Sequence, residues 1–119
     1  MATHSIVHIE ISSKDRKKTA KFYGDVFGWK SEDFPEMNYT TFGTGEGVGG
    51  GFNPVGDVSP AGTVTVYIGT EDVTESLKSV VAAGGKVVVP ESDIPGMGKF
   101  GLFKDPDGNM IGLYKDLTK

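Results

Sequence analysis

The chain has 119 residues, a mass of 12.6 kDa and 24% charged side chains, which suits one ordinary globular domain. Lys and Arg number 12 against 16 Asp and Glu, so the net charge is −4 and a nucleic-acid-binding surface is not expected. With no Cys, disulfides, thiolate metal ligands and a cysteine nucleophile are excluded. No apolar run approaches the ~18 residues of a membrane-spanning helix, and the start lacks the apolar stretch of a signal peptide. We therefore expect a cytoplasmic protein without a membrane or nucleic-acid partner.

The first half of the chain predicts the order βαβββ. Over residues 5–11, Val7, Ile9 and Ile11 alternate with His8 and Glu10, which is the period of a strand with two different faces. Residues 12–15 fit a helix capping box, and apolar residues then recur at helical spacing until Gly28. Three short segments follow that favour antiparallel strands, at residues 29–32, 39–43 and 47–52.

The second half repeats this order. A strand is predicted over residues 63–69, a helix from about Thr70 to Gly84, and further strands at 86–90, 99–103 and 110–115. A shift of 57 positions (66 − 9) lays Ile9 on Val66, Ile11 on Ile68, Asp15 on Asp72 and Gly28 on Gly85 without a gap. The fold class is therefore α+β. We expect two tandem βαβββ modules, at about residues 5–53 and 63–115, in a single domain that spans residues 1–119.

The two faces of the first strand predict where a ligand binds. Val7, Ile9 and Ile11 belong on the side of the helix, so His8 and Glu10 belong on the other face, where the repeat adds Thr65 and Tyr67. Two short sheets related by a pseudo-twofold axis are expected to curve these faces into a cup-shaped mixed sheet. Concave cups with a few polar groups are the usual place for small-molecule ligands.

Two segments carry a resemblance to a known family. Phe22-Tyr23-Gly24-Asp25-Val26-Phe27-Gly28-Trp29 ends the first predicted helix, and Asp105-Pro106-Asp107-Gly108-Asn109-Met110-Ile111-Gly112-Leu113-Tyr114 lies near the C-terminus. With these segments and the repeat, the chain resembles the vicinal oxygen chelate superfamily. That superfamily includes glyoxalase I, bleomycin-resistance proteins, fosfomycin-resistance enzymes and extradiol dioxygenases. The resemblance implies the glyoxalase/bleomycin-resistance-like fold over nearly the whole chain.

The resemblance also implies where a metal would bind. In metal-dependent members, one residue on the first strand and one on the last strand of each module converge on the ion. His8 matches the first position, whereas Thr65, Gly112 and a glycine near Gly50 stand at the other three. One imidazole is too few donors for a catalytic divalent ion, so no cofactor is expected. A weak divalent metal site that uses Glu10 beside His8 stays open as an alternative, and the glycines leave room for a bulkier organic ligand.

These residues support two functional hypotheses. In the first, His8 and Glu10 are catalytic residues that transfer protons in a glyoxalase-like lyase or isomerase acting on a carbonyl compound. In the second, the protein sequesters a ligand without metal or chemistry, as bleomycin-resistance proteins do. The ordinary structural roles, a satisfied histidine and a solvated edge carboxylate, stay open for His8 and Glu10. Either way we expect a homodimer, and the ligand-binding residues expected in the cup are Phe52, Thr65, Tyr67, Met97 and Tyr114.

Overall fold

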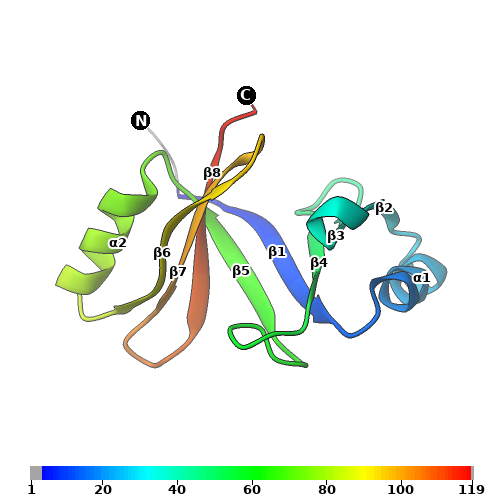
Figure 1. Cartoon of the computed structure of the whole chain (residues 1–119), viewed down its shortest axis with the longest axis horizontal. Coiled ribbons are helices and arrows are strands. Elements are labelled where there is room, and N and C mark those ends of the chain that lie inside the picture. Colours follow the sequence, from blue (N-terminus) through cyan, green and yellow to red (C-terminus); the bar gives the residue numbers. More distant parts are fainter. Residues whose placement is uncertain (1–3, 119) are drawn as a thin grey trace. The chain divides into compact units, whose positions relative to one another are not determined.

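The structure is a computed structural model that describes residues 4–118, drawn in Figure 1, and it divides into two compact units. One unit is His8–Thr65, and the other joins residues 66–118 to residues 4–7. The α+β class and the repeated order βαβββ are as the sequence predicts. Within residues 4–118, no helix has the length and apolar character required to cross a membrane.

Module one is a helix packed on a four-stranded mixed sheet. Its elements are β1 (Ile6–Ser13), α1 (Arg16–Phe27), β2 (Lys30–Phe34), the 3-10 helix η1 (Pro35–Met37), β3 (Tyr39–Gly43) and β4 (Gly50–Pro54). The strand order is β2-β3-β4-β1, with β1 parallel to β4 and the other neighbours antiparallel. The crossover through α1 therefore brings the first and last strands of the module side by side.

Stacked aromatic rings fill the space between α1 and this sheet. Trp29 stacks on Tyr23 and on Phe42, with ring centroids 4.9 and 4.7 Å apart, and Phe42 stacks on Phe52 at 4.8 Å. Phe52 is 1% exposed and also stacks on Tyr23 of α1. These contacts hold the helix against β3 and β4.

Module two repeats the arrangement. Its elements are β5 (Val64–Gly69), α2 (Val73–Ala82), β6 (Lys86–Ile94), β7 (Gly98–Lys104) and β8 (Met110–Asp116). The strand order is β5-β8-β7-β6, with β5 parallel to β8 and the other neighbours antiparallel. Figure 1 shows α2 beside β6 and β7, where Val73 and Leu77 of the helix are buried against Phe103 and Leu113.

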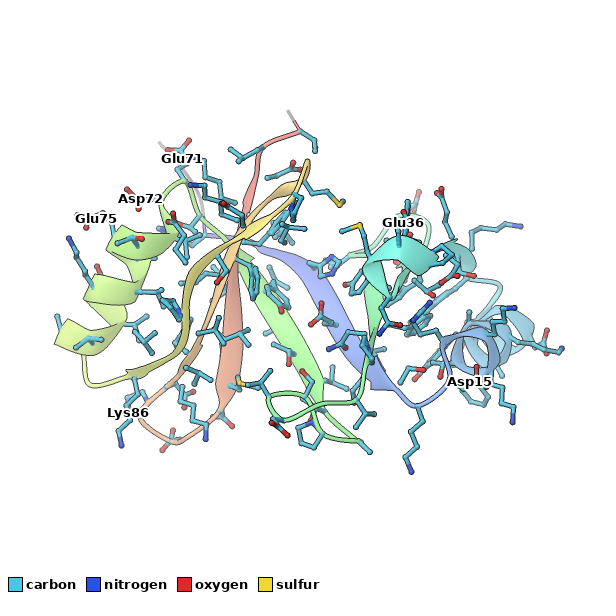
Figure 2. All side chains as sticks on the ribbon, viewed as in Figure 1. Asp15, Glu36, Glu71, Asp72, Glu75 and Lys86 are labelled. Carbon is cyan, nitrogen blue, oxygen red and sulfur yellow. The ribbon has the colours of Figure 1, made fainter. Side chains whose placement is uncertain are left out.

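Each helix has an aspartate as its N-cap residue. Asp15 accepts hydrogen bonds from the backbone N–H groups of Lys17 and Lys18, and Asp72 accepts one from Glu75. The backbone angles of Asp15 (φ −149°, ψ 101°) and Asp72 (φ −147°, ψ 100°) are nearly identical. Figure 2 shows both aspartates at the starts of their helices. The N-cap of α1 is thus Asp15 itself, because β1 continues through Ser13 where a capping box was expected.

One strand is longer than predicted. β6 crosses Pro90 and continues to Ile94, with register shifts between Val87 and Val89 and between Val89 and Ser92. Proline has no N–H to donate, and this irregular pairing on an edge strand accommodates it. The turn between β6 and β7 is consequently a tight hairpin, in which Ile94 pairs with Gly98.

Candidate functional site

Three polar side chains of module one meet on the sheet face opposite α1. His8 and Glu10 project from β1, and Tyr39 projects from the first position of β3. The Tyr39 hydroxyl lies 2.7 Å from His8 Nε2 and 2.9 Å from Glu10 Oε2. All three side chains are half-buried. The structure thus brings together the two residues expected to be catalytic and joins them through a third.

The chemistry of the three groups fixes the direction of these hydrogen bonds. A carboxylate can only accept, so the single Tyr39 proton is donated to Glu10. His8 must then donate its Nε2–H to the Tyr39 oxygen, which leaves a lone pair on Nδ1 of a neutral imidazole. The result is a directed chain from His8 through Tyr39 to Glu10.

Burial supports the neutral form of His8. Desolvation disfavours the imidazolium and lowers the pKa of His8 from its ordinary value of 6.5. The ring also stacks on Tyr39, with centroids 6.3 Å apart. Both the stacking and the lowered pKa are consistent with a neutral imidazole at neutral pH.

A glycine makes room for Tyr39. Gly51 on β4 pairs with Glu10 on one side and with Thr41 on the other, so it lies beneath the tyrosine ring. A β-carbon at Gly51 would lie 2.0 Å from the Tyr39 hydroxyl oxygen, a distance at which the ring must move. The close approach of the ring thus requires glycine at this position.

This register also places Gly50 and Gly51 on opposite faces of the sheet. Gly50 pairs with Ile9, and a β-carbon there would meet the Ile9 carbonyl oxygen at 1.7 Å and the Phe42 ring at 2.9 Å. Gly50 therefore belongs to the face of α1, and Gly51 is the β4 residue beside Glu10. Gly51 lies within the segment 49–51 in which the resemblance places the last-strand position of module one, and that assignment stays a prediction.

The same register places Phe52 on the face of α1 and not in the expected cup. The cup was expected to include this ring, but Phe52 pairs with Ile11 and lies in the aromatic stack under α1. Its ring is 1% exposed and packed on Tyr23 and Phe42, so it is a core side chain of module one.

Module two contains a matching glycine and tyrosine. Tyr67 on β5 pairs with Gly112 on β8, and a β-carbon at Gly112 would lie 2.3 Å from the Tyr67 ring. Tyr67 stands 57 positions (67 − 10) after Glu10, and Gly112 holds the place that Gly51 holds in module one. Tyr67 is buried, and so is Thr65, the counterpart of His8.

The remaining expected ligand-binding residues lie at the β6–β7 hairpin and on β8. The Tyr114 hydroxyl donates a hydrogen bond of 3.4 Å to the Met97 carbonyl oxygen. Desolvation, followed by the negative charge of Asp116, raises the pKa of the Tyr114 phenol. Met97 stays 38% exposed. Contact of Thr65, Tyr67, Met97 and Tyr114 with a ligand stays a prediction.

The residues present do not fit a divalent metal ion. Among the described residues, no group of three or more His, Cys, Asp or Glu side chains is placed to hold one. His8 Nε2 and Glu10 both turn to the Tyr39 hydroxyl, and Gly51 and Gly112 offer no side-chain donor. Two donors bridged by a phenol fall short of the three or more that a tight site requires.

Sequence reasoning missed Tyr39. The segment 39–43 was expected to be a strand, but which of its residues meets His8 depends on the pairing of β3 with β4. The alternation along 39–43 places Tyr39 and Thr41 on one face. Gly51 was the one indication in the sequence, because a glycine within a strand often marks the close approach of a bulky neighbour.

Comparisons with known proteins agree with this architecture. Residues 5–113 match the family model of the Glyoxalase/Bleomycin resistance protein/Dioxygenase superfamily. The putative glyoxylase CFP32 of Mycobacterium tuberculosis is 29% identical over 116 residues, which cover 90% of this chain and 44% of that protein. The chain thus spans less than half the length of that relative.

Solved structures with the same fold also match nearly the whole chain. The hypothetical protein BH1468 of Bacillus halodurans aligns with a TM-score of 0.75 and 16% identity, covering 99% of this chain and 98% of that one. Methylmalonyl-CoA epimerase from Mycobacterium tuberculosis aligns with a TM-score of 0.70 and 13% identity, covering 98% and 92%. The match over residues 5–113 decides the family: this chain belongs to the glyoxalase/bleomycin resistance protein/dioxygenase superfamily.

Proposed function

We propose that this protein is an enzyme that transfers a proton at a carbon beside a carbonyl group of a small organic molecule, as a lyase or isomerase does. The observation that carries the proposal is the chain of hydrogen bonds from His8 through Tyr39 to Glu10. A base, a relay and an acceptor in one hydrogen-bonded line form an arrangement suited to general acid–base catalysis. Among similar proteins, one is named a putative glyoxylase and one a methylmalonyl-CoA epimerase.

The proton follows a balanced route in this proposal. The C–H bond of the substrate breaks, its proton goes to His8 Nδ1, and its electron pair stays on the substrate as an enolate. The Nε2 proton of His8 passes to the Tyr39 oxygen as the Tyr39 proton passes to Glu10 Oε2. His8 and Tyr39 end neutral, and Glu10 ends as the carboxylic acid. Reversal of the relay returns a proton to the substrate.

Deuterium exchange tests the proposal without knowledge of the natural substrate. The probes are methylmalonyl-CoA and the hemithioacetal of methylglyoxal with glutathione, each followed in D2O by proton NMR. We expect the protein to exchange the C–H proton beside the carbonyl of at least one probe. His8→Ala, Tyr39→Phe and Glu10→Gln should each slow the exchange by about 10²- to 10⁴-fold, the usual contribution of acid–base catalysis.

Exposed residues of the same types serve as controls. His4→Ala and Glu36→Gln should leave the exchange rate unchanged, because both side chains are exposed and neither is part of the chain of hydrogen bonds. Exchange at the wild-type rate in all three site variants would contradict the proposal. Exchange should also persist after dialysis against EDTA, because the donor set does not fit a tight divalent ion.

Ligand sequestration is the second candidate. The shortage of metal donors favours it, since a binding protein needs no ion. Isothermal titration with the same two probes separates the candidates. Binding without any exchange would support sequestration and oppose the enzyme, whereas binding with exchange would support the enzyme.

A further inference from the structure

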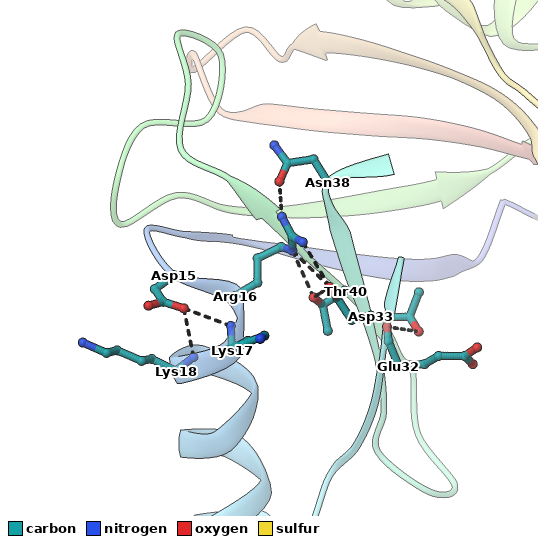
Figure 3. Close-up of polar contacts among 9 residues, drawn as sticks. Asp15, Arg16, Lys17, Lys18, Glu32, Asp33, Asn38 and Thr40 are labelled. Atoms are coloured by element: carbon teal, nitrogen blue, oxygen red, sulfur yellow. Dashed lines mark hydrogen bonds and ion pairs between the residues drawn. The ribbon is translucent and has the colours of Figure 1, made fainter. Parts of the chain in front are cut away.

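Arg16 lies at the start of α1 and holds the segment from which Tyr39 projects. Its Nε donates hydrogen bonds to Asp33 Oδ1 at 3.3 Å and to Thr40 Oγ1 at 3.1 Å. One terminal nitrogen donates to Asn38 Oδ1, and the other donates to Asp33 Oδ1 at 3.1 Å. Figure 3 shows the guanidinium reaching across from the helix to these three residues. The Arg16 side chain is 19% exposed, so most of it is withdrawn from solvent.

Two of the three acceptors are the immediate neighbours of Tyr39. Asn38 precedes it in the left-handed conformation (φ 52°, ψ 48°) and donates its backbone N–H to the Pro35 carbonyl, which ends η1. Thr40 follows it, is 3% exposed and donates its hydroxyl hydrogen to Asp33 Oδ1 at 2.6 Å. The backbone of Tyr39 is thus held on both sides by residues that share one guanidinium.

Because Thr40 is held by Arg16, the alternation of side chains along β3 fixes the face from which Tyr39 projects. Successive residues of a strand point to opposite faces. Thr40 faces α1, where it pairs with Phe52 of the core, so Tyr39 must leave on the other face, where His8 and Glu10 lie. We infer that Arg16 is a positioning residue that sets the Tyr39 hydroxyl between His8 and Glu10. This role rests on the proposed function only for its effect on turnover, because the geometry itself can be measured without a substrate.

The shape of the guanidinium matters as much as its charge. A rigid fork can serve Asn38, Thr40 and Asp33 at once, whereas the ammonium of lysine is a single point of charge on a flexible stem. Arg16→Lys should therefore behave like Arg16→Met. If charge alone mattered, the lysine variant would behave like the wild type.

The titration of His8 is the readout that a merely structural role would not move. Carbon-bound ring protons of the imidazole are followed by NMR from pH 4.5 to 8, and His8→Gln assigns the signal. We expect the titration midpoint of His8 in Arg16→Met and Arg16→Lys to move to that of Tyr39→Phe. In the Tyr39→Phe background, adding Arg16→Met should cause no further change, because Arg16 acts through the tyrosine hydroxyl.

Turnover supplies the second readout. If the probes are exchanged, Arg16→Met and Arg16→Lys should slow exchange about 10- to 100-fold with little change in KM, because a misplaced relay impairs the step and not binding. Lys21→Met is the matched control on the same helix. The Lys21 side chain is 77% exposed and pairs with Asp25, and it is not part of the Arg16 contacts, so its loss should move neither readout.

Three outcomes would overturn the inference. They are a lower melting temperature with an unmoved His8 midpoint, a wild-type midpoint in Arg16→Lys, and a midpoint shift that persists in the Tyr39→Phe background. Should Arg16→Met fail to fold, Asn38→Gly removes one acceptor and keeps the left-handed backbone. It should move the midpoint in the same direction. Absence of exchange in the wild type would refute the proposed function while the NMR titration still decides the role of Arg16.

Discussion

At the scale of single residues, His8 links the chemistry of the site to the stability of the fold. Burial keeps its imidazole neutral, which suits a base, but a buried neutral histidine must be protonated or exposed as the medium becomes acidic. Desolvation of His8 therefore affects both its protonation state and the pH dependence of folding stability.

The pH dependence of stability follows from the direction of that shift. The pKa of His8 is lowered in the folded chain, so between the folded value and about 6.5 the unfolded state binds more protons. The free energy of unfolding should rise with pH through this window and become level, for this residue, above about pH 6.5. Urea unfolding of wild type and His8→Gln at a series of pH values isolates the effect as their difference.

The difference should grow in favour of the wild type as the pH rises through the window. His4→Gln is the control for replacement of an exposed imidazole. A difference between wild type and His8→Gln that is constant from pH 4.5 to 8 would contradict the prediction.

At the scale of elements, the two helices begin in the same way because both modules place an aspartate at the N-cap. Asp15 and Asp72 each satisfy backbone N–H groups that have no partner within their helix. The coincidence of their backbone angles shows that the repeat extends to local conformation.

Removal of either cap should therefore have a similar cost. Asp15→Ala and Asp72→Ala should each lower the free energy of unfolding by about 0.5–2 kcal/mol, and the asparagine variants by less. Urea denaturation measures this. Asp25→Ala is the control, because its ion pair with Lys21 is exposed and contributes about 0.3–0.5 kcal/mol. If Asp25→Ala lowered the free energy of unfolding as much as the cap variants, the N-cap hydrogen bonds would not be the cause of the destabilisation.

The elements also show what could be predicted from the sequence and what could not. Alternation along β1 and the turn signals predicted the βαβββ order, and they predicted that His8 and Glu10 share a face. β4 is different, because its run of glycines carries no alternating pattern to fix its register. A shift of one residue sends every side chain of a strand to the opposite face, so the sequence could not show that Phe52 pairs with Ile11 and packs under α1. Tyr39 and Arg16 were missed because their partners lie 29 and 24 positions away in sequence.

At the scale of the whole molecule, the expected homodimer stays a prediction. Three apolar side chains of α1 are more than half exposed, namely Phe22 (57%), Val26 (55%) and Phe27 (63%). Exposed apolar groups on one helix are typical of surfaces that a partner covers. We expect sedimentation at micromolar concentration to give twice the chain mass of 12.6 kDa.

Substitution on α1 tests whether this helix contributes. The double variant Phe22→Ser, Phe27→Ser should shift sedimentation toward the single-chain mass, while Met37→Ser on η1, 40% exposed, should not. A wild type that sediments as one chain would contradict the dimer. A dimer that survives the α1 substitutions would place its contacts elsewhere.

In each module a tyrosine ring lies over a glycine, so a substitution at the glycine also affects the tyrosine. A side chain added at Gly51 would require the Tyr39 ring to move, and one added at Gly112 would meet the ring of Tyr67. A donor at either glycine is therefore compatible with the neighbouring tyrosine only if the ring moves or is replaced. We therefore expect the effect of a substitution at Gly51 or Gly112 to depend on whether its tyrosine, Tyr39 or Tyr67, is present.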